Sequence, residues 1–310
     1  MLTSFVFLQV PIFAQNTDAV TEIIVPFAPG GAATQIGQFV SKVLNDSRIN
    51  AVVINKPGNN SIIAGNYVAK AEPNGHTLFI GSTSSIVSNT VFKNQQVGLE
   101  YTESSFIPIV LLNQSALGMV VATNAPFKNY KDFKKYIKAN PTKFNIGTYN
   151  ANYGHLFKDW AQREGLPEPT IIFYKGSSGM MTDVVGGSLL SAFDNIGWGA
   201  PALPLLDANR LQLIATFDNT ASKDVARVGY PVTDLSRLHP ELKFSVWIAL
   251  FAPAGTPNGV VNNLNKTINQ AITNPQYRSQ VLFMDGIGGN PEVLGNMVKR
   301  DLQTLKKFNQ

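Results

Sequence analysis

The feature that most constrains the fold of this chain is a repeated order of apolar run, Gly- or Pro-rich turn and amphipathic helical pattern. The first unit runs from the apolar residues 22–27 through Pro-Gly-Gly at 29–31 into a helical pattern at 34–44. Apolar runs at 51–57 and 76–82 begin further units. Parallel strands need a crossover connection, usually a helix, so this order favours an α/β fold with largely parallel sheets.

The chain of 310 residues is long enough to form two lobes, each with its own core. The last two helical patterns, 258–272 and 291–308, need a sheet to cover, and the first series of strands offers one. We therefore expect lobe 1 to comprise residues 18–115 and 246–310 and lobe 2 to comprise residues 116–245, each a mostly parallel sheet flanked by helices. The chain would then cross between the lobes twice, which suits a hinge.

The N-terminal segment has the character of an export signal. The first charged residue is Asp18, and the apolar stretch before it ends close to the small residue Ala14. We expect residues 1–15 to be a signal peptide with a truncated or mis-started beginning, because the positively charged part of such a signal is missing. A buried first strand is the alternative that this absence favours. An export signal predicts a soluble periplasmic protein, and no apolar run approaches the length that spans a bilayer.

Composition excludes several classes of function. The chain has no cysteine, so thiol catalysis, zinc–cysteine sites and iron–sulfur clusters are excluded. Its three histidines, His76, His155 and His239, are not spaced as metal ligands or as part of a catalytic triad. The net charge of +5 comes from scattered basic residues rather than a dense patch, which argues against a nucleic-acid partner. We expect no metal, no cofactor and no catalytic residue.

Two glycine-rich turns, 29–34 and 174–179, are candidates for binding an anion. Each follows an apolar strand and opens a helical pattern. Glycine lets the backbone approach a ligand closely, and the unpaired amides at a helix start attract a negative group. One such turn from each lobe could hold a carboxylate across a cleft. In the alternative interpretation, the glycines only make sharp connections and Lys175 is a solvated surface charge.

Other strand ends carry polar or aromatic side chains that could join this cleft. Ser82 and Thr83 follow the third strand pattern, and Thr148 and Asn150 lie in another strand-to-helix turn. Asp194 lies near a further strand end, and Trp198 could roof the pocket. We interpret His155 as a packing or capping residue at a helix start rather than as a catalytic base.

Four ordered segments resemble those of a known family: VPFAPGG at 25–31, NKPGNNSIIAGNYVAKAEPNGHTLFIGS at 55–82, FYKGSSGMMTDVVGGSLLSAFDN at 173–195 and LFAPAGTP at 250–257. The family is the Bug-type extracytoplasmic solute receptors, the substrate-binding proteins of tripartite tricarboxylate transporters. The resemblance extends from about Ile23 to the C-terminus. It implies a periplasmic, type II-like binding protein of the Venus flytrap kind. Such a protein closes on a di-, tri- or aromatic carboxylate and delivers it, as a monomer, to integral membrane subunits of a secondary transporter.

The resemblance also implies which residues bind the ligand. In this family, loops of both lobes grip a carboxylate mainly through backbone amides and ordered waters. With the strand-end residues above, the predicted ligand-binding set is Phe27, Gly31, Ala32, Ala33, Thr34, Ser82, Thr83, Thr148, Asn150, Tyr174, Lys175, Gly176, Ser177, Asp194 and Trp198.

The chain departs from the family pattern at two places. Thr34 stands where the family usually has aspartate. Our hypothesis is that the missing charge disfavours ligands with an ammonium group, such as amino acids, relative to plain carboxylates. The chain also has GTYNANYGH at 147–155 where the family tends to be rich in serine and glycine. There Tyr149 and Tyr153 would give the pocket a different shape, suited to an aromatic or narrower ligand.

Two other classes of function remain open at this point. One is an enzyme of the same bilobal architecture acting on a small carboxylate, although the sparse histidines and unpaired carboxylates speak against it. The other is a binding module that serves a signalling partner. Binding would be the same in a sensor and in a transport receptor, so the residues do not separate these two roles.

Overall fold

One continuous mixed sheet of ten strands runs through the described part of the chain. The structure is a computed structural model and describes residues 19–30, 32–93, 96–150, 153–174, 176–197, 200–219, 223–277 and 287–307. The predicted signal segment 1–15 lies outside these residues. The strands are β1 (Thr21–Val25), β2 (Ala51–Asn55), β3 (Thr77–Ser82), β4 (Phe106–Ala122), β5 (Asn145–Thr148), β6 (Thr170–Phe173), β7 (Ser191–Ile196), β8 (Leu211–Thr216), β9 (Thr233–Asp234) and β10 (Ser245–Pro253).

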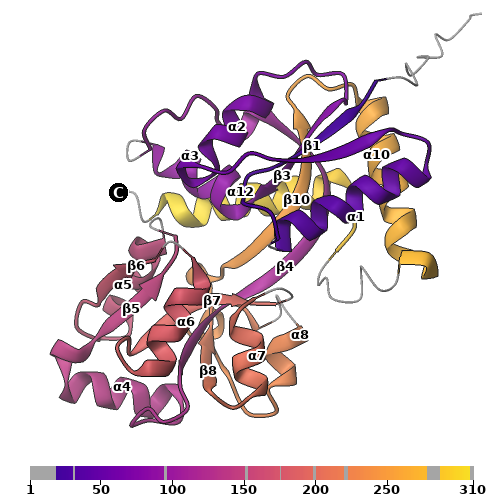
Figure 1. Ribbon diagram of the computed structural model, residues 1–310. Helices are drawn as coiled ribbons and strands as arrows, with labels where there is room; N and C mark the ends of the chain where they lie inside the picture. Colours follow the sequence, from indigo (N-terminus) through magenta and orange to yellow (C-terminus); the bar gives the residue numbers. More distant parts are fainter. Residues whose placement is uncertain are drawn as a thin grey trace, which may run out of the picture.

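Helices connect these strands and cover the sheet (Figure 1). The α-helices are α1 (Ala32–Asp46), α2 (Ile62–Ala69), α3 (Asn89–Val91), α4 (Tyr130–Ala139), α5 (Tyr153–Arg163), α6 (Ser177–Gly186), α7 (Ala202–Asp207), α8 (Lys223–Arg227), α9 (Leu235–Leu238), α10 (Asn258–Thr273) and α12 (Pro291–Lys306). A π-helical turn, η2 (Thr83–Ser88), continues from β3, and 3₁₀ turns lie at η1 (Asn59–Ser61), η4 (Glu103–Ser105), η5 (Pro141–Lys143), η7 (Pro240–Leu242) and η8 (Pro275–Tyr277).

The strand directions follow from how the chain passes between the lobes. The order is β2-β1-β3-β10-β4-β7-β5-β6, with β8 on β4 and β9 on β8. Strand β1 is parallel to β2 and β3, and β5 is parallel to β6 and β7. In contrast, β10 is antiparallel to β3 and β4, and β4 is antiparallel to β7 and β8. The predicted α/β class is confirmed, with antiparallel pairs where one strand leaves a lobe and another returns.

The long strand β4 and its neighbour β10 connect the two lobes (Figure 1). The first part of β4 pairs with β10, from Phe106 opposite Pro253 to Ala116 opposite Ser245. The last part of β4 pairs with β7 and β8. One lobe carries α1, α2, α10 and α12 and the other carries α4 to α8 (Figure 1). The residue boundaries of the lobes given above stay a prediction.

The turn between β1 and α1 is called the first glycine corner, and the turn before α6 is called the second. Helix α1 holds the first glycine corner in place through its apolar face. Its buried residues Ile36, Phe39, Val40, Val43 and Leu44 recur at the spacing of a single helix face. They belong to one hydrophobic cluster with residues of β1 and β3. The helix therefore begins directly after the turn that follows β1, as the apolar pattern predicts.

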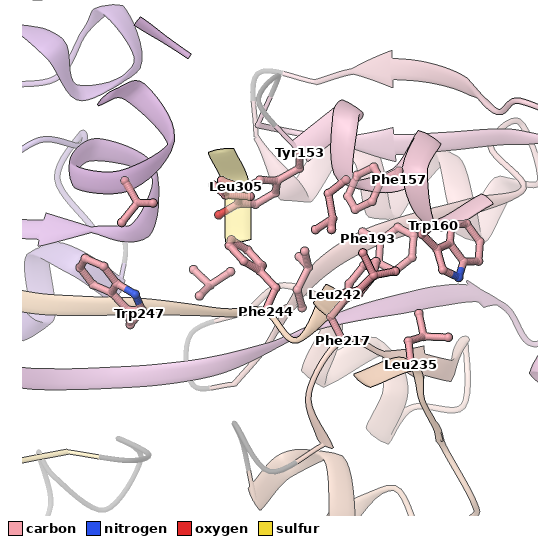
Figure 2. Packing of buried hydrophobic residues seen from close by; sticks show 14 of the residues in the cluster. Tyr153, Phe157, Trp160, Phe193, Phe217, Leu235, Leu242, Phe244, Trp247 and Leu305 are labelled. Carbon is pink, nitrogen blue, oxygen red and sulfur yellow. The ribbon is translucent and has the colours of Figure 1, made fainter. Parts of the chain in front are cut away.

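Aromatic rings fill the core of the second lobe (Figure 2). The Phe157 and Phe193 rings are stacked with centroids 4.3 Å apart, and Phe217 lies 5.1 Å from Phe193. The cluster continues towards the crossing strands, where the ring of Tyr153 meets that of Phe244 edge-on at 5.3 Å. Figure 2 shows Trp247 at the end of this row nearest the first lobe. The packed core thus extends from the second lobe to the connection between the lobes.

Trp247 fixes strand β10 at the point where the lobes meet. Its side chain is fully buried. Its indole N–H donates to Asp301 of α12 over 2.7 Å, and its backbone N–H donates to the Thr83 hydroxyl over 2.9 Å. The Arg300 guanidinium also pairs with the buried Asp301 carboxylate. Burial raises the pKa of Asp301, although Arg300 and the indole oppose this shift. The C-terminal helix is therefore anchored to the crossing strand.

Replacing the buried acceptor of this anchor should destabilise the fold. In Asp301→Ala the buried indole N–H of Trp247 loses its partner, so we expect the free energy of unfolding to fall by about 2 kcal/mol or more. Chemical denaturation measures this change. Glu292→Ala removes an exposed acid from the same helix and is the control. Equal effects of the two substitutions would contradict the proposed anchor.

Candidate functional site

A cavity of about 510 Å³ lies between the two lobes, and both lobes and the crossing strand β10 contribute to its wall. Most of the residues that the sequence predicted for ligand binding lie in this wall. They are Phe27, Ala32, Ala33, Ser82, Asn150, Gly176, Ser177 and Asp194. Gly31, Lys175 and Trp198 are outside the residues that the structure describes. Whether the wall residues bind a ligand stays a prediction.

The remaining predicted residues do not line the cavity, because their side chains are used within the fold. Thr83 accepts the N–H of Trp247, and the buried Thr148 hydroxyl bonds the backbone of Asn150 at 3.2 Å. The Tyr174 hydroxyl donates to Asp183 over 2.7 Å. For Thr34, Thr83, Thr148 and Tyr174 the structure supports a local structural role.

Several wall residues escaped the reasoning from sequence. They are Pro26 and Ala28 beside β1; Pro57, Gly58, Asn60 and Ser61 after β2; Asn113 and Ser115 in β4; Ala200 and Pro201; and Val246, Trp247 and Ile248 in β10. Tyr149, which was expected to shape the pocket, also lines the wall, together with Ser84 and Asn195. The position of the loop after β2 could have been predicted from the sequence. Strand β2 is parallel to β1, so both strands end at the same edge of the sheet. No local pattern predicts that the residues of β4 and β10 lie in the wall, because they reach it only through the pairing of distant segments.

The first glycine corner brings the start of α1 to the cavity. Ala28, Ala32 and Ala33 line the wall there, and Gly30 has a φ of 96°, which favours glycine. Asn55 holds the corner from β2, donating to the Phe27 carbonyl over 2.8 Å and to the Thr34 hydroxyl over 3.0 Å. Beside Pro26 and Phe27, the wall at the start of α1 has only small side chains, so main-chain amides of the first helical turn can reach a ligand.

The loop after β2 approaches the cavity in an unusual backbone conformation. Asn59, Asn60 and Ser61 all have positive φ, at 43°, 51° and 73°. Asn60 and Asn89 hold this loop, since the Asn60 side-chain amide donates to Asn89 Oδ1 and the Asn89 amide donates to the Asn60 carbonyl, both over 2.8 Å. Such strained backbone persists where the surroundings fix it, and it occurs often at binding sites.

Asp194 is the buried acid of the second-lobe wall and is only 1% exposed. Its carboxylate accepts a hydrogen bond from the Ser177 hydroxyl at the start of α6, and a second from the Asn195 N–H over 2.8 Å. Burial raises the pKa of Asp194 to about 6, although these two hydrogen bonds oppose the shift. Burial, and then the charge of Asp194, raise the pKa of the neighbouring Tyr149. The start of α6, the second glycine corner, is therefore hydrogen-bonded to a carboxylate of the protein itself.

Two contacts join the lobes, and one of them lies at the cavity. The Asn150 side-chain amide donates to the Ser84 hydroxyl over 2.7 Å, and both residues line the wall. The His155 ring stacks on Phe92, with centroids 5.0 Å apart and planes 12° from parallel. This contact confirms the interpretation of His155 as a packing residue at a helix start.

The described part of the wall carries little charge. Among its described residues no lysine, arginine or histidine is present, and Asp194 is the only carboxylate. In the described ranges, no group of three or more acidic or histidine side chains could hold a metal ion. In those ranges no helix is both long and apolar enough to cross a membrane.

Known proteins match this chain over most of its length. The profile of the tripartite tricarboxylate transporter family receptor matches residues 33–296. A protein encoded between tcbD and tcbE in Pseudomonas sp. (strain P51) is 29% identical, with 92% of this chain and 84% of that protein covered. A solved periplasmic transporter structure is 27% identical with a TM-score of 0.76, covering 93% of this chain and 95% of the other.

Two further solved structures contain ligands. MatC of Rhodopseudomonas palustris with bound malate has a TM-score of 0.74 and 20% identity, covering 94% of this chain and all of that chain. Rpa4515 of the same organism, with adipate, has a TM-score of 0.74 and 22% identity, covering 93% and 96%. At these identities the likeness concerns the fold. The chain belongs to the family of tripartite tricarboxylate transporter receptors, which are solute-binding proteins rather than enzymes.

Proposed function

We propose that this chain is a periplasmic receptor that captures a small carboxylate in the cavity between its lobes and delivers it to the membrane subunits of a tripartite tricarboxylate transporter. The observation that carries the proposal is the cavity of about 510 Å³ between the lobes, with the first turn of α1 in its wall. The malate and adipate bound by two proteins of the same fold are both small dicarboxylates, which supports this ligand class.

The physical basis of capture is the unpaired amides at the start of α1. A helix start carries a partial positive charge and free N–H groups, so a carboxylate binds there without a cationic side chain. Ala32 and Ala33 leave these amides open to the cavity because their side chains are small. Residues of the second lobe, such as Asn150 and Ser177, would then close over the ligand.

Delivery and ligand choice are the finer parts of the proposal. A receptor whose two lobes close on a ligand presents a different surface when loaded. The membrane subunits would recognise that surface on a single receptor molecule, because the receptor would act as a monomer. A signalling partner could read the same change. Thr34 does not reach the cavity wall, so its replacement of the family aspartate would act on ammonium-bearing ligands only through the loop that it holds.

A carboxylate ligand should stabilise the protein by mass action. At a hundredfold excess over the dissociation constant, the free energy of unfolding rises by about 2.7 kcal/mol, because the ligand binds only the folded chain. A thermal-shift screen of di-, tri- and aromatic carboxylates measures this rise, with the matching amides as uncharged controls. A screen in which the amides stabilise as well as the acids would contradict the proposal.

An added acid at the start of α1 should weaken carboxylate binding. We expect Ala32→Asp to weaken binding at least about tenfold, because the new charge lies where the ligand anion would bind. The fold should be kept, since an acid in a first helical turn stabilises the helix. The control is Gln35→Asp, which adds the same charge at an exposed position of the same turn. Isothermal titration measures both variants, and equal affinities would contradict a site at this corner.

Binding of a plain dicarboxylate should depend on the protonation of Asp194. A ligand anion near Asp194 favours the neutral form of this carboxyl group, so Asp194 takes up a proton when the ligand binds. Binding therefore weakens as the pH rises above the Asp194 pKa of about 6. We expect the affinity for succinate to fall by up to about tenfold per pH unit between pH 7 and pH 8.5, where succinate itself stays ionised. The Asp194→Asn variant should lose this dependence. A wild-type affinity independent of pH would contradict the argument.

A further inference from the structure

The two sides of the cavity offer a ligand opposite kinds of group. The first-lobe side has the amides at the start of α1, which are hydrogen-bond donors. The second-lobe side has the carboxylate of Asp194 and the side chain of Asn195. We propose that the Asp194 wall selects carboxylates that also carry a hydrogen-bond donor, a hydroxyl or an amino group, over the same acids without it. For an amino group this preference opposes the disadvantage expected from Thr34. This inference rests on the proposed carboxylate binding and names the ligand more closely.

The Asp194 carboxylate has acceptor capacity left after its contacts within the protein. A carboxylate has about four lone-pair positions. The Ser177 hydroxyl donates to Oδ2 and the Asn195 N–H donates to Oδ1, so each oxygen retains a further position. Asp194 takes part in none of the ion pairs of the described residues, which are formed by other acids. A donor on the ligand would therefore find an unneutralised buried acceptor.

Asn195 adds a second acceptor to the same wall. Its side-chain Oδ1 is buried and has no hydrogen-bond partner among the described residues. A buried polar atom without a partner is costly, and native proteins rarely keep one without a use. Asn195 follows Asp194 directly in β7, so the two side chains leave the strand on opposite faces, and both residues line the cavity near the end of the strand. A ligand donor bound here would satisfy an atom that the protein leaves unpaired.

The same wall works against a ligand that presents only acceptors. A second carboxylate beside Asp194 would place two like charges together in a buried site, and no described cationic side chain of the wall would offset them. A hydroxyl or an amino group donates to Asp194 instead. Discrimination is therefore two-sided: the donor-bearing ligand gains a charge-assisted hydrogen bond, and the plain acid meets repulsion.

Matched acids that differ by one donor test this inference. Titration calorimetry at pH 8 compares succinate with malate, tricarballylate with citrate, and phenylacetate with mandelate, each second acid having one added hydroxyl. Aspartate is the amino counterpart of malate. At pH 8 Asp194 is ionised, as its pKa is about 6. Within the class of acid that binds, we expect the hydroxyl-bearing member to bind at least about tenfold more tightly, the size expected for a hydrogen bond to a charged group.

The Asp194→Asn variant separates selection from structure. Removing the charge should strengthen binding of the plain acid and weaken binding of its hydroxylated partner, so that their affinities come within about threefold of one another. A merely structural Asp194 would change both affinities by the same factor and leave the ratio as in the wild type. The control Asp183→Asn alters a second-lobe carboxylate that accepts a tyrosine hydroxyl but does not line the cavity, and it should keep the wild-type ratio.

The outcomes distinguish this inference from the proposal beneath it. A hydroxylated or aminated acid bound more tightly than its plain partner, with the preference lost in Asp194→Asn, supports the inference. Equal wild-type affinities for the two members of a pair, or a preference that persists in Asp194→Asn, overturn it and leave carboxylate capture standing. If the wild type binds none of these acids, carboxylate capture and the inference both fall. The wild-type comparison decides even if the variant fails to fold.

Discussion

The antiparallel pairing of β4 with β10 is the contact on which the rest of the architecture depends. Each lobe has its own parallel strands, but these two paired strands make one sheet of both. The pairing places Asn113 and Ser115 of β4 opposite Ile248 and Val246 of β10, and all four line the cavity. The cavity therefore lies against the connection itself, and the anchored Trp247 is part of its wall.

Local order in the chain was enough to predict β1, α1 and the corner between them. The apolar run 22–27 and the glycines after it predicted β1, the turn and α1, because both signals act within a few residues. The same reasoning applies to the start of α6, where Gly176 and Ser177 line the cavity. Residues 106–117, in contrast, were not recognised as part of one strand, since a long buried strand has no alternating pattern that marks its extent.

Side-chain direction was harder to predict than backbone position. Ser82 and Thr83 are neighbours in sequence, yet Ser82 lines the cavity while Thr83 turns to the backbone of Trp247. Tyr174 and Gly176 share a turn, and only the glycine lines the cavity. The bond between Ser177 and Asp194 depends on how α6 packs against β7, which no local pattern specifies. The local sequence predicted the turns at the cavity but not the hydrogen-bond partners of the residues in them.

The two irregularities in the β4–β10 pairing bear on how such a receptor can move. The register shifts between Ile248 and Ala249 and again between Leu250 and Phe251. Bulges of this kind increase local twist and bend the strand that carries them. Two hydrogen-bonded strands deform together by twisting, whereas loose loops would let the lobes swing freely. Any change in the angle between the lobes would thus also change the shape of the cavity floor. The width of the cavity opening and the contacts to a ligand would therefore change together.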